Sequence, residues 1–161
     1  MQRIYSKNDF KVYTCMLQVL YDLELTDKDY WWLISDIEAV PIKKGNEEFI
    51  CNKRFVLLKT SELVNLLKDE DFLWIWAVFS AIPSHYEKCD ILNFELPYLR
   101  FVDEGQYDPH EDEPKLQHPY AEFELYAVDS SYFFMITDDE ELINRFKKCY
   151  PKYYIDETAI N

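Results

Sequence analysis

The chain has 161 residues, a net charge of −14 and 48% hydrophobic residues, which is enough apolar material for one domain with its own core and excludes a disordered chain. Two glycines are too few for the glycine-rich loops that cradle phosphates, and the acid excess excludes nucleic acid and anionic membranes as partners. Because no secretory signal and no bilayer-spanning apolar run is present, we expect a cytoplasmic protein.

The first two expected elements are a helix and a strand. Apolar residues recur at helical intervals within residues 6–23, which predicts a helix there. Residues 29–41 fit both the helical and the strand period. Their aromatic and β-branched side chains, and the proline at their end, favour a strand that is interrupted at Ser35 and Asp36.

The middle of the chain is expected to hold the centre of a sheet. Residues 47–60 predict two short strands with a break between them, and a helix over 61–71 follows, capped by Thr60 or Ser61. Residues 72–83 form an uncharged run rich in Trp, Phe, Ile and Val, which favours a central strand covered on both faces. A buried helix is the alternative for this run.

Residues 84–119 lack a regular pattern and contain four prolines. We expect one long irregular excursion there, with a helical turn near 87–93. Loops of this length without structure of their own are uncommon in compact domains and are usually functional or disordered.

A hairpin is expected over residues 121–137, with its turn at Asp129 and Ser130. Its first strand alternates between two sets of side chains, Phe123, Leu125 and Ala127 against Glu122, Glu124 and Tyr126.

The chain is expected to end on a helix and a short strand. Thr137 and the acids after it predict a capping box for a helix over 138–149, which Pro151 ends, and residues 152–156 could return as a last strand. Together the elements predict a single-domain α+β fold: a mostly antiparallel sheet with helices packed on it and one long acidic loop.

No catalytic motif accompanies these elements. Four side chains of metal-ligand type fall within eleven residues, Asp108, His110, Asp112 and His118, but their spacing matches no known ligand scaffold. Cys89 near His85 cannot be told from an inert thiol beside a surface imidazole, and the four cysteines form no close pair. We therefore expect no enzyme, no cofactor and no metal.

Four tryptophans have two interpretations. Trp31, Trp32, Trp74 and Trp76 fit core positions on apolar strands, and the alternative is the lining of a small-molecule pocket.

The stretch DEGQYDPHEDEP, residues 103–114, concentrates six carboxylates, whose mutual repulsion a Lys- or Arg-rich partner would relieve. Two nearby tyrosines add aromatic anchors of the kind found at binding hot spots. The alternative is a solvated loop whose charge serves solubility. The predicted partner-binding residues are Asp103, Glu104, Tyr107, Asp108, Glu111, Asp112, Glu113 and Tyr120.

The segments DYWWLISD, FSAIP, ILNFELPYL and ELYAVDSSYFFMITDDEELINRF resemble small bacterial proteins of unknown function whose build is similar to that of immunity proteins of polymorphic toxin systems. The resemblance implies a cytoplasmic protein that covers the active site of a cognate toxin, frequently a basic nuclease. It transfers no contact residue, so the predicted interface depends on charge alone.

The sequence thus favours a non-enzymatic protein that binds and neutralises a basic protein, such as a toxin or nuclease domain. One alternative is a phage-type anti-defence protein whose carboxylates imitate the charge of DNA. Another is a small-molecule- or metal-binding protein or enzyme. The oligomeric state stays open.

Overall fold

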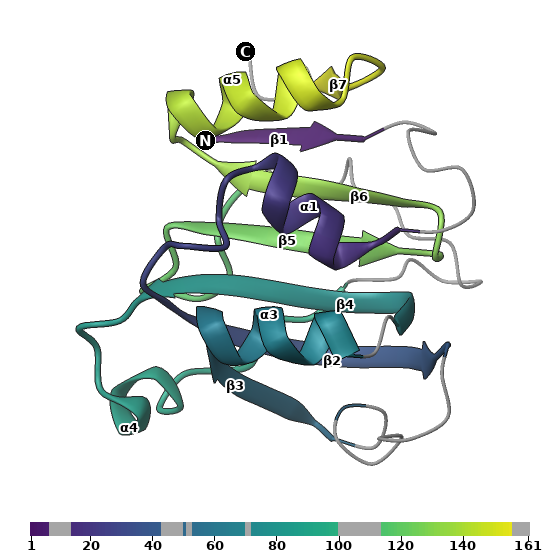
Figure 1. Ribbon diagram of the computed structural model, residues 1–161. Helices are drawn as coiled ribbons and strands as arrows, with labels where there is room; N and C mark the ends of the chain where they lie inside the picture. The colour runs from purple at the N-terminus through teal and green to yellow at the C-terminus, as the bar shows by residue number, and fades with distance from the viewer. Residues whose placement is uncertain (7–13, 43–49, 51–52, 70–71, 100–113, 156–161) are drawn as a thin grey trace, which may run out of the picture.

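The computed structural model describes residues 1–6, 14–42, 50, 53–69, 72–99 and 114–155. In these residues seven strands form one sheet in the order β3-β2-β4-β5-β6-β1-β7, with every neighbouring pair antiparallel (Figure 1). The strands are β1 (Gln2–Tyr5), β2 (Tyr30–Pro41), β3 (Phe55–Lys59), β4 (Phe72–Pro83), β5 (Phe123–Val128), β6 (Tyr132–Thr137) and β7 (Tyr154–Ile155). The helices are α1 (Met16–Asp22), α3 (Thr60–Asp69), α4 (Lys88–Ile91) and α5 (Glu140–Cys149). The expected α+β fold is confirmed.

Strand β4 lies at the centre of the sheet, between β2 and β5. None of its residues is exposed, as expected for an uncharged run that loses water on both faces. The prediction of a central strand is confirmed, and the alternative of a buried helix is wrong. Strand β3 pairs with the opposite edge of β2, so α3 carries the chain across β2 from β3 to β4.

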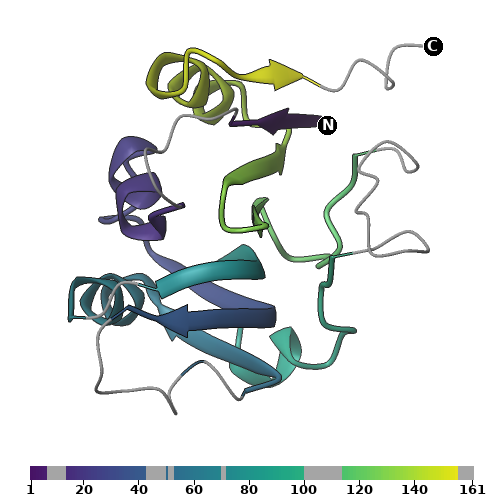
Figure 2. The ribbon, with the colours of Figure 1, turned by 90° about the vertical axis from the view of Figure 1, so that its right-hand side faces the viewer.

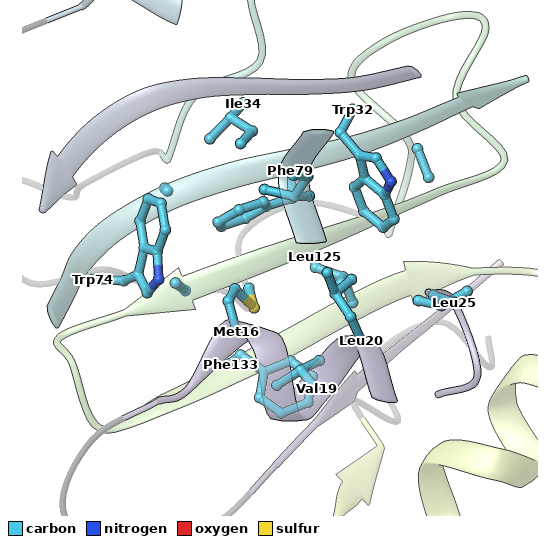
Figure 3. Packing of buried hydrophobic residues seen from close by; sticks show 14 of the residues in the cluster. Met16, Val19, Leu20, Leu25, Trp32, Ile34, Trp74, Phe79, Leu125 and Phe133 are labelled. Atoms are coloured by element: carbon cyan, nitrogen blue, oxygen red, sulfur yellow. The ribbon is translucent and has the colours of Figure 1, made fainter. Parts of the chain in front are cut away.

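One face of the sheet is covered by α1, α3 and α5, and this first face holds the main core. Phe123, Leu125 and Ala127 of β5 point into it, as their alternation predicted. Figure 3 shows Phe79 of β4 between Trp32 and Trp74, with side chains of α1 packed below them. Both tryptophans are fully buried, which confirms the core interpretation for these two.

The second face of the sheet is buried as well, by the excursion between β4 and β5. Figure 2 shows α4 and the coil around it on the side opposite to α1 and α3. Glu124 and Tyr126, which alternate with the core residues of β5, are buried here. The helical turn predicted near 87–93 is confirmed as α4.

Strand β2 contains the predicted interruption. Its register against β4 shifts between Ser35 and Glu38, and Asp36 has a φ of 50°. An extra residue in one strand bends it and turns side chains away from the regular pleat, as in a β-bulge. The bulge turns Asp36 toward the excursion on the second face, where its carboxylate accepts a hydrogen bond from the Leu99 N–H.

The N-terminal expectations need correction. Residues 2–5 form β1, which the sequence did not predict, and it lies between β6 and β7. The helix expected over 6–23 begins only at Met16, while residues 7–13 lie outside the described part of the chain. Of the first strand expected within 47–60, the structure describes only Ile50, which is helical and buried.

Helix capping also differs from the prediction. The N-cap of α5 is Asp139, whose carboxylate accepts hydrogen bonds from the Glu141 and Leu142 N–H groups, and Thr137 instead accepts one from the Asp139 N–H. At α3 the Thr60 hydroxyl accepts from the Trp32 indole rather than capping the helix. The hairpin is confirmed, with Asp129 and Ser130 both at positive φ, and so is the last strand as β7.

Candidate partner-binding surface

The carboxylate of Glu124 fixes the excursion to the second face. It is fully buried on β5 and accepts hydrogen bonds from the Gln117 and His118 N–H groups at 2.9 Å each. The hydroxyls of Ser80 and Tyr126 also donate to it. An ionised carboxyl group is an acceptor at both oxygens, so four converging donors satisfy it without water.

His118 lies directly after this contact and is 1% exposed. Its Nδ1 accepts from the Tyr120 N–H at 3.2 Å, and its Nε2 lies 3.0 Å from the Ile91 carbonyl oxygen at the end of α4. Because Nδ1 is used as an acceptor, Nε2 carries the proton and donates. The ring therefore ties α4 to the segment that carries Tyr120.

A group of stacked rings, the Tyr120 cluster, lies on the outside of this framework. It consists of His85, Tyr86, Phe94, His118 and Tyr120. Tyr120 stacks on Tyr86 with ring centroids 4.1 Å apart and an interplanar angle of 8°, and Phe94 meets it edge-on at 5.0 Å. Phe94 is 38% exposed, and His85 is exposed. The cluster therefore presents aromatic surface to solvent in fixed geometry.

The two described ends of the acidic stretch meet beside the Tyr120 cluster. Tyr98 and Gln117 are joined by two hydrogen bonds, from the Tyr98 N–H to Gln117 Oε1 and from Gln117 Nε2 to the Tyr98 carbonyl oxygen. Leu99 and Pro114 are buried. Ser35 at the β2 bulge donates to the Pro97 carbonyl oxygen at 2.6 Å. The described residues on either side of 100–113 are therefore both attached to one face of the sheet.

Negative charge is concentrated on this part of the chain. Residues 84–122 contain ten carboxylates and three Lys or Arg residues, which accounts for seven of the fourteen net negative charges in about a quarter of the sequence. Glu87, Asp90, Glu95 and Glu122 are described and exposed. An even distribution would give this stretch about half as much.

Glu122 has a specific partner across the sheet. The Tyr30 hydroxyl of β2 donates to its carboxylate at 2.7 Å. Burial raises the pKa of Tyr30 above its ordinary value, and the neighbouring Glu122 carboxylate raises this pKa further.

Of the predicted partner-binding residues, Tyr120 is the one that the structure describes, and it lies in the cluster that carries its name. The others lie outside the described residues: Asp103, Glu104, Tyr107, Asp108, Glu111, Asp112 and Glu113.

Three polar residues that position this surface were not singled out from the sequence: Glu124, Gln117 and Asp36. Glu124 alternates with core residues on β5, which is the pattern of an exposed strand face, so only knowledge of what covers the second face could reveal it. Asp36 carried a signal, because the strand pattern breaks at its position.

The enzyme-like candidates stay separate in the described residues. His118 is held by backbone groups on both ring nitrogens, and Asp108, His110 and Asp112 lie outside them. Within the described ranges no group of three or more His, Cys, Asp or Glu side chains could hold a metal ion. Cys89 is exposed, and its sulfur lies 3.9 Å from the Asp90 carboxylate.

A pocket on the helical side of the sheet, lined by residues that include Tyr30, Phe123 and Arg145, has a volume of about 60 Å³. It has room for a few water molecules, whereas pockets for small-molecule ligands measure about 300 Å³ or more.

Comparisons with protein-family models, curated proteins and solved structures find no match for this chain. Among the described residues, no helix is long and apolar enough to cross a membrane.

Proposed function

We propose that the chain is a non-enzymatic acidic protein that binds and neutralises a basic protein, in the manner of an immunity protein that blocks a bacterial toxin or nuclease domain. The observation that carries the proposal is the concentration of half the net charge in residues 84–122, whose described parts pack on one face of the sheet beside an exposed aromatic cluster.

The two features have complementary roles in binding. A concentrated negative potential attracts a Lys- and Arg-rich surface over a distance of about 10 Å at physiological salt and speeds the encounter. Aromatic side chains then supply contact area with little loss of side-chain entropy. Tyr98 and Tyr120 fit the second role, because their backbone is already hydrogen-bonded before any partner arrives. Phe94 fits it through its edge-on contact with Tyr120.

The test first searches beside the gene for a toxin-like open reading frame and then purifies its product as a catalytically inactive variant. We expect it to bind the chain in a one-to-one complex, and Tyr120→Ala to weaken binding at least about tenfold by isothermal titration calorimetry. Tyr21→Ala is the matched control, since Tyr21 is 45% exposed on α1, on the other face of the sheet. Equal affinity of Y120A and Y21A, with both variants folded by circular dichroism, would remove the Tyr120 cluster from the interface.

The same carboxylates could oppose a DNA-binding protein, because both kinds of partner present cations to them. Competition by duplex DNA for a bound partner that has no nuclease activity would assign the chain to DNA mimicry. Insensitivity to duplex DNA supports toxin neutralisation.

A further inference from the structure

The strand at one end of the sheet has a free edge. Strand β3 pairs only with β2 in the described part of the chain. The Lys59 N–H donates to the Glu62 carboxylate at 2.7 Å and so points away from β2. Since N–H directions alternate along an antiparallel pair, the N–H groups of Phe55 and Leu57 also point away from β2. An unpaired edge of this kind is a template for another strand.

This edge carries the opposite charge to the rest of the molecule. Residues 50–61 contain Lys53, Arg54 and Lys59 and no acid, in a chain with 31 acids. Lys53 and Arg54 are exposed just before β3, and Lys59 lies at its other end. Lys53 and Arg54 make one end of the edge positive, and Lys59 at the other end lies beside the Glu62 carboxylate that accepts its own N–H.

A fourth cation joins Lys59 over one aromatic ring. The Lys59 Nζ lies 3.8 Å and the Lys88 Nζ 4.7 Å from the centroid of the Trp31 ring. Lys88 is exposed on α4, and the Trp31 indole donates to the Tyr86 carbonyl oxygen, which fixes the ring. Neither ammonium group has a carboxylate within 4 Å among the described residues. Two like charges are thus held together without the anion that would neutralise them.

We propose that the β3 edge is a second docking site, which binds an extended acidic peptide segment of another protein by strand addition. Backbone hydrogen bonds to Phe55 and Leu57 align the segment, and its carboxylates contact Lys59, Lys88 and Arg54. A basic partner of the acidic stretch would be repelled here, so the two sites accept partners of opposite charge. This inference does not depend on the function proposed above.

The geometry specifies the sequence pattern of the peptide. Phe55, Leu57 and Lys59 share the second face with Trp31, whereas Val56 and Leu58 face the main core beneath α3. Every neighbouring pair in the sheet is antiparallel, and in such a pair the residues opposite Phe55 and Leu57 point to the same face as these two. In the bound peptide, acidic residues therefore alternate with aliphatic ones, and the backbone groups of the acidic residues form the hydrogen bonds to β3.

The test measures fluorescence polarisation of a labelled six-residue peptide of alternating Glu and Val with blocked ends. We expect binding to the full chain and about tenfold weaker binding to the double variant K59Q/K88Q. The control K28Q/K68Q removes two exposed lysines that are not part of β3 or α4 and should bind like the wild type. A peptide with Gln in place of every Glu should bind the wild-type chain as weakly as the Glu peptide binds K59Q/K88Q.

Backbone methylation separates strand addition from simple charge attraction. Methylation of the three Glu nitrogens should abolish binding, and methylation of the three Val nitrogens should preserve it, because only the Glu N–H groups face β3. Equal binding of the two methylated peptides, no binding of the parent peptide, or equal losses in K59Q/K88Q and K28Q/K68Q would each overturn the proposal.

Discussion

Single polar side chains determine whether the second face of the sheet can be covered. Four hydrogen-bond donors take the place of water around the Glu124 carboxylate, and two of them are backbone N–H groups of the excursion itself. The Gln117 amide extends this network, since it donates to the Tyr126 hydroxyl and holds Tyr98. A buried network is stable only while every member keeps its partner. The position of the aromatic surface therefore depends on residues that a binding partner would not touch.

Glu124→Gln should lower the free energy of unfolding by about 3 kcal/mol, because an amide nitrogen cannot accept the hydrogen bonds that one carboxylate oxygen now takes. Urea unfolding measures the change. Glu95→Gln, an exposed carboxylate of the same excursion, should change stability by less than about 0.5 kcal/mol. Equal effects of E124Q and E95Q would mean that the network does not anchor the excursion.

Tyr30 predicts how stability changes in alkali. Burial and Glu122 raise its pKa in the folded protein above the value of about 10 in the unfolded chain. The folded state then keeps a proton that the unfolded state loses, so this stabilisation is complete below about pH 10 and declines as the pH rises further. The stability of Tyr30→Phe, measured by urea unfolding between pH 8 and 11, should fall less with pH than that of the wild type. Parallel curves would contradict this role.

Glu124 also marks the limit of inference from sequence at this scale. A glutamate between Phe123 and Leu125 has the alternation of an exposed strand face, and nothing nearby signals that a segment from elsewhere will cover it. Its burial follows from a contact between β5 and residues of the excursion, which local periodicity does not encode.

At the scale of elements, the sequence predicts a helix or strand best where contacts between residues close in sequence supply most of its stability. The start of α5 was predictable within two residues because acids at its first turn and cations at its last match the helix dipole. The sequence did not predict whether Thr137 or Asp139 is the N-cap, since either side chain can accept hydrogen bonds from the first turn of a helix. The residue at which β6 ends decides between them.

Asp139→Ala should lower the free energy of unfolding by about 1 kcal/mol through loss of the cap to Glu141 and Leu142. Asp138→Ala is a matched control, because it removes the same charge beside the same helix end but no hydrogen bond among the described residues. Thermal unfolding of both variants measures the difference. If D138A were as damaging as D139A, charge near the dipole rather than the cap would explain the loss.

Strand β1 shows why some elements were missed. Its four residues gain their stability from β6 and β7, which lie more than 120 residues away in sequence. A segment this short has too few positions for a period to show. The bulge in β2 was visible because Ser35 and Asp36 interrupt a twelve-residue apolar pattern.

At the scale of the whole molecule, different parts of the chain cover the two faces of the sheet. Helices α1, α3 and α5 close the main core on one face, and the described parts of the excursion, with the Tyr120 cluster, lie on the other. Residues 84–122 hold half of the net charge in the sequence. The sequence predicted that the excursion exists and is acidic. It could not predict that α4, Tyr98 and Tyr120 come together, because hydrogen bonds between distant segments bring them there.

The central claim is that the acids of the excursion, and not the net charge alone, attract a basic partner. The association rate with a basic toxin or nuclease domain that binds the chain, measured by stopped flow from low to high ionic strength, tests it most directly. The triple variant E111Q/D112N/E113Q should associate about tenfold more slowly at low salt and show a flatter salt dependence. The variant D27N/D129N/D138N removes the same charge from exposed positions elsewhere and should stay close to the wild type. Equal slowing of the two triple variants would contradict the account.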